Sequence, residues 1–187
     1  MNAAPVLATT ALSALLAFIV SYAIGSIPWA YTIVRLVTGE DVTAHGTGNV
    51  GAMNVRRTTD SWAWFVVAMV ADVLKGVIPV GVFKYLALGT LLTPTGVAVA
   101  GALGDAALPM AAVSGAVFGH NYSAWMALVK RRFARTGKGL ATGAGALLAY
   151  DWRYFVAVVA VGLLTIAVTR YMMAGQVTAA FTLPVVA

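Results

Sequence analysis

The sequence contains no cysteine, and charged residues make up only 10% of its 187 positions. Without cysteine, disulfide bonds, thiolate metal sites and cysteine nucleophiles are excluded. With so few charges and 61% hydrophobic residues, the chain cannot bury its apolar surface as a soluble domain of this size would. A mean hydropathy of +0.89 therefore predicts a protein whose main solvent is the lipid bilayer.

Acidic residues are scarce: the chain has 6 Asp and Glu and 12 Lys and Arg, which gives a net charge of +6. In a polytopic membrane protein, basic residues gather in cytoplasmic loops for topological reasons, so this charge does not indicate nucleic-acid binding. The 2 histidines and the scattered aspartates form no metal-ligand pattern, and no metal or other cofactor is expected. Because Met1–Ala17 contains no Lys or Arg, a cleaved signal peptide is not expected.

Long apolar runs predict membrane-spanning helices. The first extends from about Pro5 to Leu36, more than the ~20 residues needed to cross a bilayer. Within it, Gly25-Ser26-Ile27-Pro28 should kink the helix or loosen its cytoplasmic end. Further spans are expected at Trp62–Tyr85 and Val97–Phe118, with a turn at Thr93-Pro94 between them.

The remaining apolar runs are shorter. Gly139–Tyr150 is short for a full crossing, Tyr154–Val168 predicts another helix, and the run from Gly175 onward is about half a span. Asp105 falls within the third expected span, and a loop region or a helix break is the alternative. Because repeats and low-complexity linkers are absent, the sequence predicts one domain over residues 1–187. The predicted fold is an all-α, polytopic, integral membrane bundle with about five to six spans or partial spans.

Basic residues predict the orientation of these spans. Arg35, Arg56 and Arg57 flank the first polar loop, and five more basic residues gather in the second, whereas the turn near Thr90–Thr95 has none. By the positive-inside rule, both polar loops are cytoplasmic, the N-terminus is outside, and the two loops can meet in one site. The basic residues of the second loop are Lys130, Arg131, Arg132, Arg135 and Lys138.

A polar, glycine-rich segment, Asp41–Arg57, separates the first two spans. Its Gly46–Gly51 formally matches GxGxxG, but dinucleotide binding requires a strand context that this chain does not offer. The glycines instead allow backbone N–H groups to form an anion-binding nest, with the positive end of a following helix behind it. The alternative is a tight turn that needs positive φ. Anion binding is favoured because Asn49, Asn54 and Arg57 are more polar than a turn requires.

The second polar loop contains Arg135-Thr136-Gly137-Lys138-Gly139. It is not a Walker A loop, because Arg132 stands where that motif has its first glycine and Lys138 is followed by glycine. A basic residue framed by glycines at the start of a span still suits a phosphate. Positive-inside charge alone is the alternative explanation of all five basic residues.

Three ionisable residues lie in or next to apolar runs. Asp72 and Lys75 are three residues apart, so they share one helix face and can pair. A charge in the bilayer costs roughly 2.5–3.5 kcal/mol even on the insertion scale, so this pair indicates a functional site or an essential pairing. His120 follows the third span and could be a base, a hydrogen-bond donor to an oxyanion or an interfacial residue. His45 is expected to be a solvated loop residue.

Taken together, these segments resemble the bacterial acyl-phosphate:glycerol-3-phosphate acyltransferases, the PlsY family. The resemblance is carried by Gly25–Pro28, Gly46–Asn54 with Arg57, Asp72–Gly76, Gly119–Asn121, Gly137–Thr142 and Arg170-Tyr171. The chain departs from the family pattern at Thr43, Thr47, Met53, Tyr122-Ser123 and Arg135-Thr136. Its segment from His120 to Lys138 is several residues longer, and the family's last span and third motif have no counterpart within the 187 residues.

The resemblance implies an enzyme of the bacterial cytoplasmic (inner) membrane that uses no metal and no acyl-CoA. It would transfer a fatty acyl group from acyl phosphate to the 1-hydroxyl of sn-glycerol 3-phosphate, giving lysophosphatidic acid and phosphate in the first step of phospholipid synthesis. Such a site needs fixed positive donors at the membrane surface and a lipid-accessible groove beside them. A catalytically impaired relative that binds or carries a phosphorylated metabolite or lipid is the alternative, and a purely structural membrane subunit is a third.

Residue roles follow from the same resemblance. The implied catalytic residues are Thr47, Arg57, Lys75, His120 and Lys138. The implied phosphate-binding residues are Gly46, Gly48, Asn49, Gly51, Asn54, Arg135, Thr136, Gly137, Gly139 and Thr142. The expected partners are glycerol 3-phosphate, acyl phosphate and membrane lipids.

Overall fold

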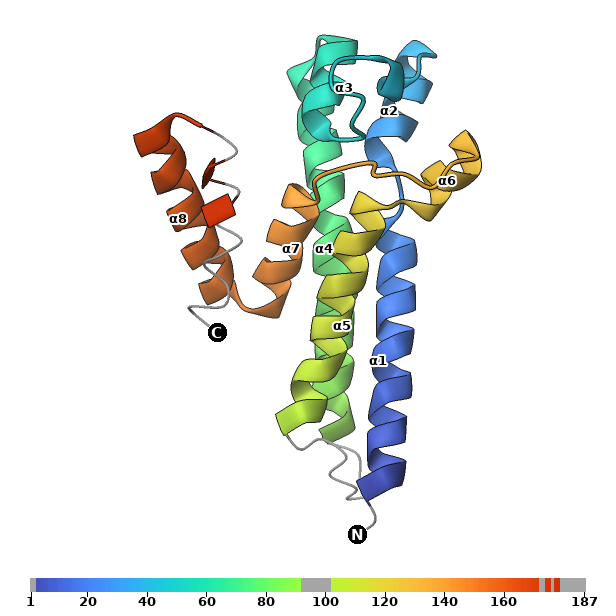
Figure 1. Ribbon diagram of the computed structural model, residues 1–187, viewed down its shortest axis with the longest axis vertical. Coiled ribbons are helices and arrows are strands. Elements are labelled where there is room, and N and C mark those ends of the chain that lie inside the picture. The colour runs from blue at the N-terminus through green and yellow to red at the C-terminus, as the bar shows by residue number, and fades with distance from the viewer. Residues whose placement is uncertain (1–2, 92–101, 172–173, 176, 179–187) are drawn as a thin grey trace.

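The computed structural model describes residues 3–91, 102–171, 174–175 and 177–178. Over these residues the regular secondary structure is helical and includes no strand. Three long helices, α1 (Ala3–Gly25), α4 (Trp62–Leu91) and α5 (Ala102–Asn121), pack side by side (Figure 1). The predicted all-α helical bundle is therefore confirmed.

Shorter helices surround this central bundle. Helices α2 and α3 extend one end of it, α6 projects to one side, and α7 leads into α8 on the other side (Figure 1). Helix α1 begins at the end of the bundle opposite α2 and α3 (Figure 1). The bounds are α2 (Trp29–Thr38), the 3-10 turn η1 (Val42–Ala44), α3 (Ala52–Thr59), α6 (Ala124–Lys130), α7 (Leu140–Tyr150) and α8 (Trp152–Thr169).

Glycines allow the long helices to approach each other closely. A Cβ atom at Gly119 of α5 would lie 2.3 Å from the carbonyl oxygen of Tyr22 in α1. A Cβ atom at Gly76 of α4 would lie 2.1 Å from the carbonyl oxygen of Thr142 in α7. Small residues of this kind are how membrane helices gain packing contacts, since lipid provides no hydrophobic force between them.

Three described segments are long and apolar enough to cross a membrane, namely Thr10–Thr38, Trp62–Ala87 and Trp152–Thr169. Helix α7 is apolar but shorter, as expected for a partial span. Large apolar side chains face away from the bundle, for example Leu15, which is 54% exposed, and Leu164, which is 67% exposed. Such an outer surface is stable in lipid, where no water has to be excluded from it.

The structure corrects several expected boundaries. The expected interruption at Gly25–Pro28 is confirmed, since α1 ends at Gly25 and α2 begins at Trp29. Helix α4 continues to Leu91, and Asp105 lies in the first turn of α5 rather than in a loop or helix break. Helix α6 forms inside the stretch that was expected to be a polar loop. The turn at Thr93-Pro94 and most of the final apolar run lie outside the described residues.

Candidate active site

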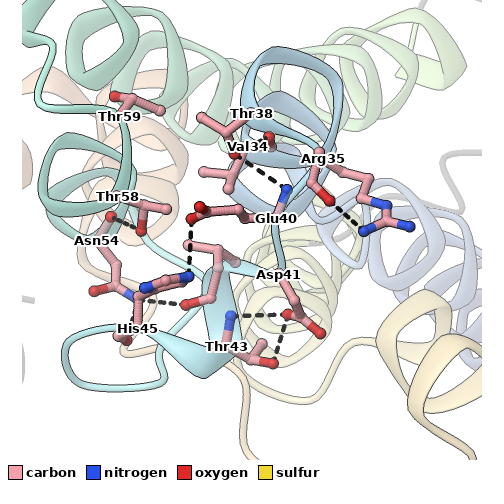
Figure 2. Close-up of polar contacts among 12 residues, drawn as sticks. Val34, Arg35, Thr38, Glu40, Asp41, Thr43, His45, Asn54, Thr58 and Thr59 are labelled. Atoms are coloured by element: carbon pink, nitrogen blue, oxygen red, sulfur yellow. Dashed lines mark hydrogen bonds and ion pairs between the residues drawn. The ribbon is translucent and has the colours of Figure 1, made fainter.

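The glycine-rich segment folds around the side chain of Asn54, which is 2% exposed. Its Nδ2 donates to the carbonyl oxygens of Val42 at 2.8 Å, His45 at 2.9 Å and Asn49 at 3.1 Å. Figure 2 shows Asn54 beside the exposed ion pair of His45 and Glu40, whose Nε2–Oε2 distance is 2.9 Å. Both amide hydrogens of Asn54 are therefore committed to the loop. The expected phosphate contact by this amide is replaced by a role in shaping the loop.

Two of the predicted glycines adopt the left-handed backbone conformation. Gly46 has φ +53° and Gly48 has φ +70°, and a Cβ atom at Gly46 would lie 2.3 Å from Oδ1 of Asn54. Gly51 has an extended backbone instead, and α3 begins directly after it. The segment thus contains both the tight turn and the N-terminus of the following helix. The side chains of Thr47 and Arg57 are exposed at its surface.

A second set of contacts ties this segment to α6. Asp41 accepts hydrogen bonds from the backbone N–H of Thr43 at 2.9 Å and from its hydroxyl at 2.7 Å (Figure 2). Asp41 also forms an ion pair with Lys130 at the end of α6. Partial burial raises the pKa of Asp41, but the hydrogen bonds from Lys130 and Thr43 outweigh it and lower that pKa to about 2.

Thr136 joins the two polar loops. Its carbonyl oxygen accepts from the backbone N–H of Val50 at 2.7 Å. Its own N–H donates to the carbonyl oxygen of Asn121 at 2.7 Å, and its hydroxyl donates to the carbonyl oxygen of His120 at 2.8 Å. The expected meeting of the two loops is therefore confirmed. The hydroxyl hydrogen of Thr136 is donated to a carbonyl oxygen at the end of α5, so it is not available to an anion. The contribution of Thr136 is to fix the conformation of the loop.

A buried polar quartet, defined as Asp72, Lys75, His120 and Thr142, lies between α4, α5 and α7. Lys75 Nζ is 2.9 Å from Asp72 Oδ1, which confirms the predicted pair. His120 Nδ1 is 3.1 Å from the hydroxyl oxygen of Thr142 and 3.8 Å from Asp72 Oδ1. All four residues are at most 7% exposed. Charges buried in this way persist only when each has a partner, so the quartet behaves as one unit.

The break between α1 and α2 supplies further partners. Lys75 Nζ donates to the carbonyl oxygen of Ile27 at 3.0 Å. The hydroxyl of Ser123 donates to the carbonyl oxygen of Ser26. In a membrane-embedded helix, carbonyl groups released by a break near proline must find donors elsewhere. The Gly25–Pro28 segment therefore anchors Lys75 from one side while Asp72 holds it from the other.

Gly137 places the second loop directly over the quartet. A Cβ atom at Gly137 would lie 2.3 Å from His120 Nε2, so only glycine lets the backbone approach the imidazole this closely. Gly139 has φ +71° and precedes the first residue of α7. Between these two glycines, the side chain of Lys138 is exposed, and exposed Arg135 donates from Nε to the carbonyl oxygen of Gly137 at 3.1 Å.

Two cavities flank the segment 135–139. The first, of about 540 Å³, is polar and basic, and the second, of about 660 Å³, is apolar and lies between α5, α7 and α8. Asn121 and Gly139 lie at the polar part of the second cavity. The first is lined by Thr43, Gly48, Val50, Met126, Lys130, Arg132, Ala134, Arg135 and Thr136. The apolar walls of the second include Val117, Leu140, Leu147, Phe155 and Leu163.

Several residues of this site were named from the sequence only as members of a motif or loop, without a role of their own. Ser26 and Ser123 hold the helix break, Asp41 fixes α6, and Arg132 lines the polar cavity. The pattern Ser123-Ala-Trp-Met126 before an apolar stretch was a usable signal, because a serine N-cap accepts from the N–H three residues later, as it does here at 3.1 Å. No spacing rule places Arg132 and Gly48 at the same cavity, since their positions depend on how α6 folds.

Known proteins of one family are similar to this chain. The family model described as glycerol-3-phosphate acyltransferase matches residues 15–187. The chain belongs to the glycerol-3-phosphate acyltransferase family. Glycerol-3-phosphate acyltransferase 2 of Moorella thermoacetica is 36% identical over 175 residues, which cover 91% of this chain and 75% of the relative. The enzyme of Nitrobacter winogradskyi is 33% identical over 170 residues, covering 91% and 74%.

Solved structures of this family show the same fold. The crystal structure of PlsY, an integral membrane glycerol 3-phosphate acyltransferase, in its glycerol 3-phosphate form is 28% identical to this chain, with a TM-score of 0.63. The match covers 89% of this chain and 72% of that one. A second PlsY structure, the lysophosphatidic acid form, has a TM-score of 0.62. The chain is therefore an integral membrane member of the acyltransferase family.

Proposed function

We propose that this protein transfers a fatty acyl group from acyl phosphate to the 1-hydroxyl of sn-glycerol 3-phosphate, giving lysophosphatidic acid and phosphate. The observation that carries the proposal is the position of segment 135–139, with a basic cavity on one side and an apolar cavity on the other. One substrate is a small phosphate anion and the other joins a phosphate to a long acyl chain. Membership of the glycerol-3-phosphate acyltransferase family supports the same reaction.

The two cavities suit the two substrates. Glycerol 3-phosphate binds in the basic cavity, where Arg132 and Arg135 provide charge and the Gly48 backbone leaves room for an anion. The acyl chain of the donor lies in the apolar cavity, and its phosphate lies over Gly137–Gly139 within reach of Lys138. Thr47 and Arg57, exposed on the neighbouring loop, bind the phosphate nearest to them.

Acyl transfer in this site depends on proximity and on charge. The 1-hydroxyl oxygen attacks the acyl carbonyl carbon, and the bond from that carbon to the phosphate oxygen breaks. The hydroxyl proton passes to a phosphate oxygen, so inorganic phosphate leaves with the bonding electrons and the proton. Lys138 and Arg57 stabilise the developing oxyanion and the leaving phosphate. His120 and the rest of the buried quartet hold the segment that carries Lys138.

We further propose that residues 1–187 act as one domain in a bacterial cytoplasmic membrane. Both polar loops face the cytoplasm and the N-terminus lies outside. The positive-inside distribution of Arg56, Arg57 and the residues from Lys130 to Lys138 supports this orientation. It places the basic cavity on the side where a water-soluble phosphate substrate is available.

The test is an assay of purified protein in lipid with labelled glycerol 3-phosphate. Labelled lysophosphatidic acid should form when acyl phosphate is supplied and should not form with acyl-CoA. Product with acyl-CoA alone would contradict the donor assignment. Saturable binding of glycerol 3-phosphate without product from either donor would replace this proposal with a binding or transport function.

A further inference from the structure

Helix α6 (Ala124–Lys130) and the residues after it present an apolar face that the acyltransferase site does not use. Between 50% and 72% of each of four large apolar side chains is exposed on this face. The basic residues Arg131 and Arg132, directly after the helix, are exposed as well. The four apolar residues are Trp125, Leu128, Val129 and Phe133. Aromatic and aliphatic side chains next to arginines are typical of elements at a membrane–water interface.

Contacts at both ends and in the middle hold α6 in this orientation. At its start, Ser123 caps the helix and donates its hydroxyl hydrogen to the carbonyl oxygen of Ser26. In the middle, Met126 is 2% exposed and packs into the core cluster that joins α2 and α3. At its end, Lys130 pairs with Asp41. The exposed face is therefore a fixed product of the fold.

The position of α6 matches the boundary of the lipid-facing surface. Trp125 Nε1 donates to the carbonyl oxygen of Ala23, close to the end of α1, at 3.3 Å. Earlier on α1, Ile19 and Val20 are 50% and 45% exposed, as side chains facing lipid are. Figure 1 shows α6 projecting sideways from the bundle near the point where α1 ends. The apolar face of α6 thus lies at the edge of the apolar surface of α1.

We propose that α6 is a membrane-surface anchor that binds the headgroups of anionic phospholipids. Its apolar side chains enter the boundary between headgroups and acyl chains, while Arg131 binds a lipid phosphate. Charge complementarity selects anionic lipid as the occupant. Lys130 is neutralised by Asp41, whereas no ion pair in the described part of the chain involves Arg131. This inference is independent of the acyl-transfer chemistry.

A reporter on α6 tests the proposal in the intact protein. Because the chain has no cysteine, Leu128→Cys provides a unique attachment point for an environment-sensitive fluorophore. The labelled protein is placed in vesicles of phosphatidylcholine, with or without about one third phosphatidylglycerol. With the anionic lipid, quenching by neutral acrylamide should fall and the emission should shift to the blue. Equal quenching in the two membranes overturns the proposal.

A matched pair of variants separates lipid binding from general effects of charge. Arg131 and Arg170 are both exposed arginines that end a helix in the left-handed conformation, with φ of 50° and 56°. Asp tolerates that conformation, so Arg131→Asp and Arg170→Asp make equivalent changes in charge. Arg131→Asp should reduce the preference of the reporter for anionic membranes roughly fivefold, and Arg170→Asp should leave it unchanged. The opposite pattern, or no effect of Arg131→Asp, contradicts the proposal.

Two further readouts keep the test independent of any variant. Raising the salt to about 1 M shortens the screening length to about 3 Å and should abolish the lipid preference of the otherwise unaltered labelled chain. Fluorophore self-quenching that depends on protein concentration, at constant lipid composition, would instead show that α6 contacts a second copy of the chain. That result would overturn the assignment of lipid as the occupant. The same conclusion would follow if the fluorophore were protected from acrylamide only when a soluble protein is added.

Discussion

The buried polar quartet and the exposed basic residues above it use charge in opposite ways. Asp72 and Lys75 pair at 2.9 Å with little exposure, and Lys75 is also held by the carbonyl oxygen of Ile27. Arg57 and Lys138 are exposed, and within the described residues neither takes part in an ion pair. The quartet is therefore committed to holding three helices together, whereas the exposed cations are available for phosphate.

We expect the buried quartet to position the site and the exposed cations to touch substrate. Lys75 and His120 were implied as catalytic residues, with His120 polarising or positioning the substrate, and their burial behind the loop backbone at Gly137 favours a positioning role. Loss of a quartet residue should first reduce stability, and loss of an exposed cation should first reduce turnover.

The strongest effect is expected for Asp72→Ala, which leaves Lys75 buried without its carboxylate partner. Breaking one half of a buried pair costs about 3–5 kcal/mol, so most of the protein should fail to fold or should unfold at a much lower temperature. Thermal unfolding in detergent measures this loss. The double variant Asp72→Leu with Lys75→Met removes both charges and should recover most of the stability. If the double variant is as unstable as the single one, the quartet is not stabilised as a charge pair.

Lys138→Ala should affect turnover rather than folding, because Lys138 is exposed between two glycines that fix the loop without it. Loss of one oxyanion or phosphate donor costs about 100- to 1,000-fold in rate. The measurement is kcat/KM for glycerol 3-phosphate with acyl phosphate, beside the thermal unfolding temperature. Arg57→Ala should behave in the same way. Arg153→Ala, at an exposed basic residue at the start of α8, is the control, and wild-type rates in all three variants would contradict the proposed site.

Gly137→Ala links the two regions, since the new methyl group would meet His120 Nε2 at 2.3 Å. The loop must move away from the imidazole, and Lys138 then moves with it. A displacement of about 1 Å can cost about 100-fold in rate. The matched control is Gly81→Ala in α4, outside the proposed site, where a Cβ atom has no neighbour within 4 Å. If the two variants retain equal activity, the contact between loop and quartet does not position Lys138.

The sequence predicted the helical class, the pairing of Asp72 with Lys75 and the meeting of the two polar loops. Each of these depends on local patterning or on charge distribution along the chain. It did not predict α6, because this helix has only 7 residues, apolar up to Lys130, which is too short to show a helical period. It also assigned Asn54 to substrate, because a polar side chain that shapes a loop and one that binds a ligand look the same in sequence. Only the three carbonyl partners of Asn54 distinguish the two roles.

The smallest effect is expected at the Asp41–Lys130 pair, which resembles the quartet in chemistry but is partly exposed. Asp41→Asn should cost about 0–1 kcal/mol at neutral pH, since exposed ion pairs contribute little. The pKa of Asp41 is lowered from 3.8 to about 2 in the folded protein, so its stabilising contribution is fully present above pH 3.8 and is lost as the pH falls through about 2. Unfolding temperatures of the wild type and Asp41→Asn should therefore converge as the pH approaches 2. A difference that stays constant down to that pH would show that the carboxylate charge is not what holds α6 to the glycine-rich segment.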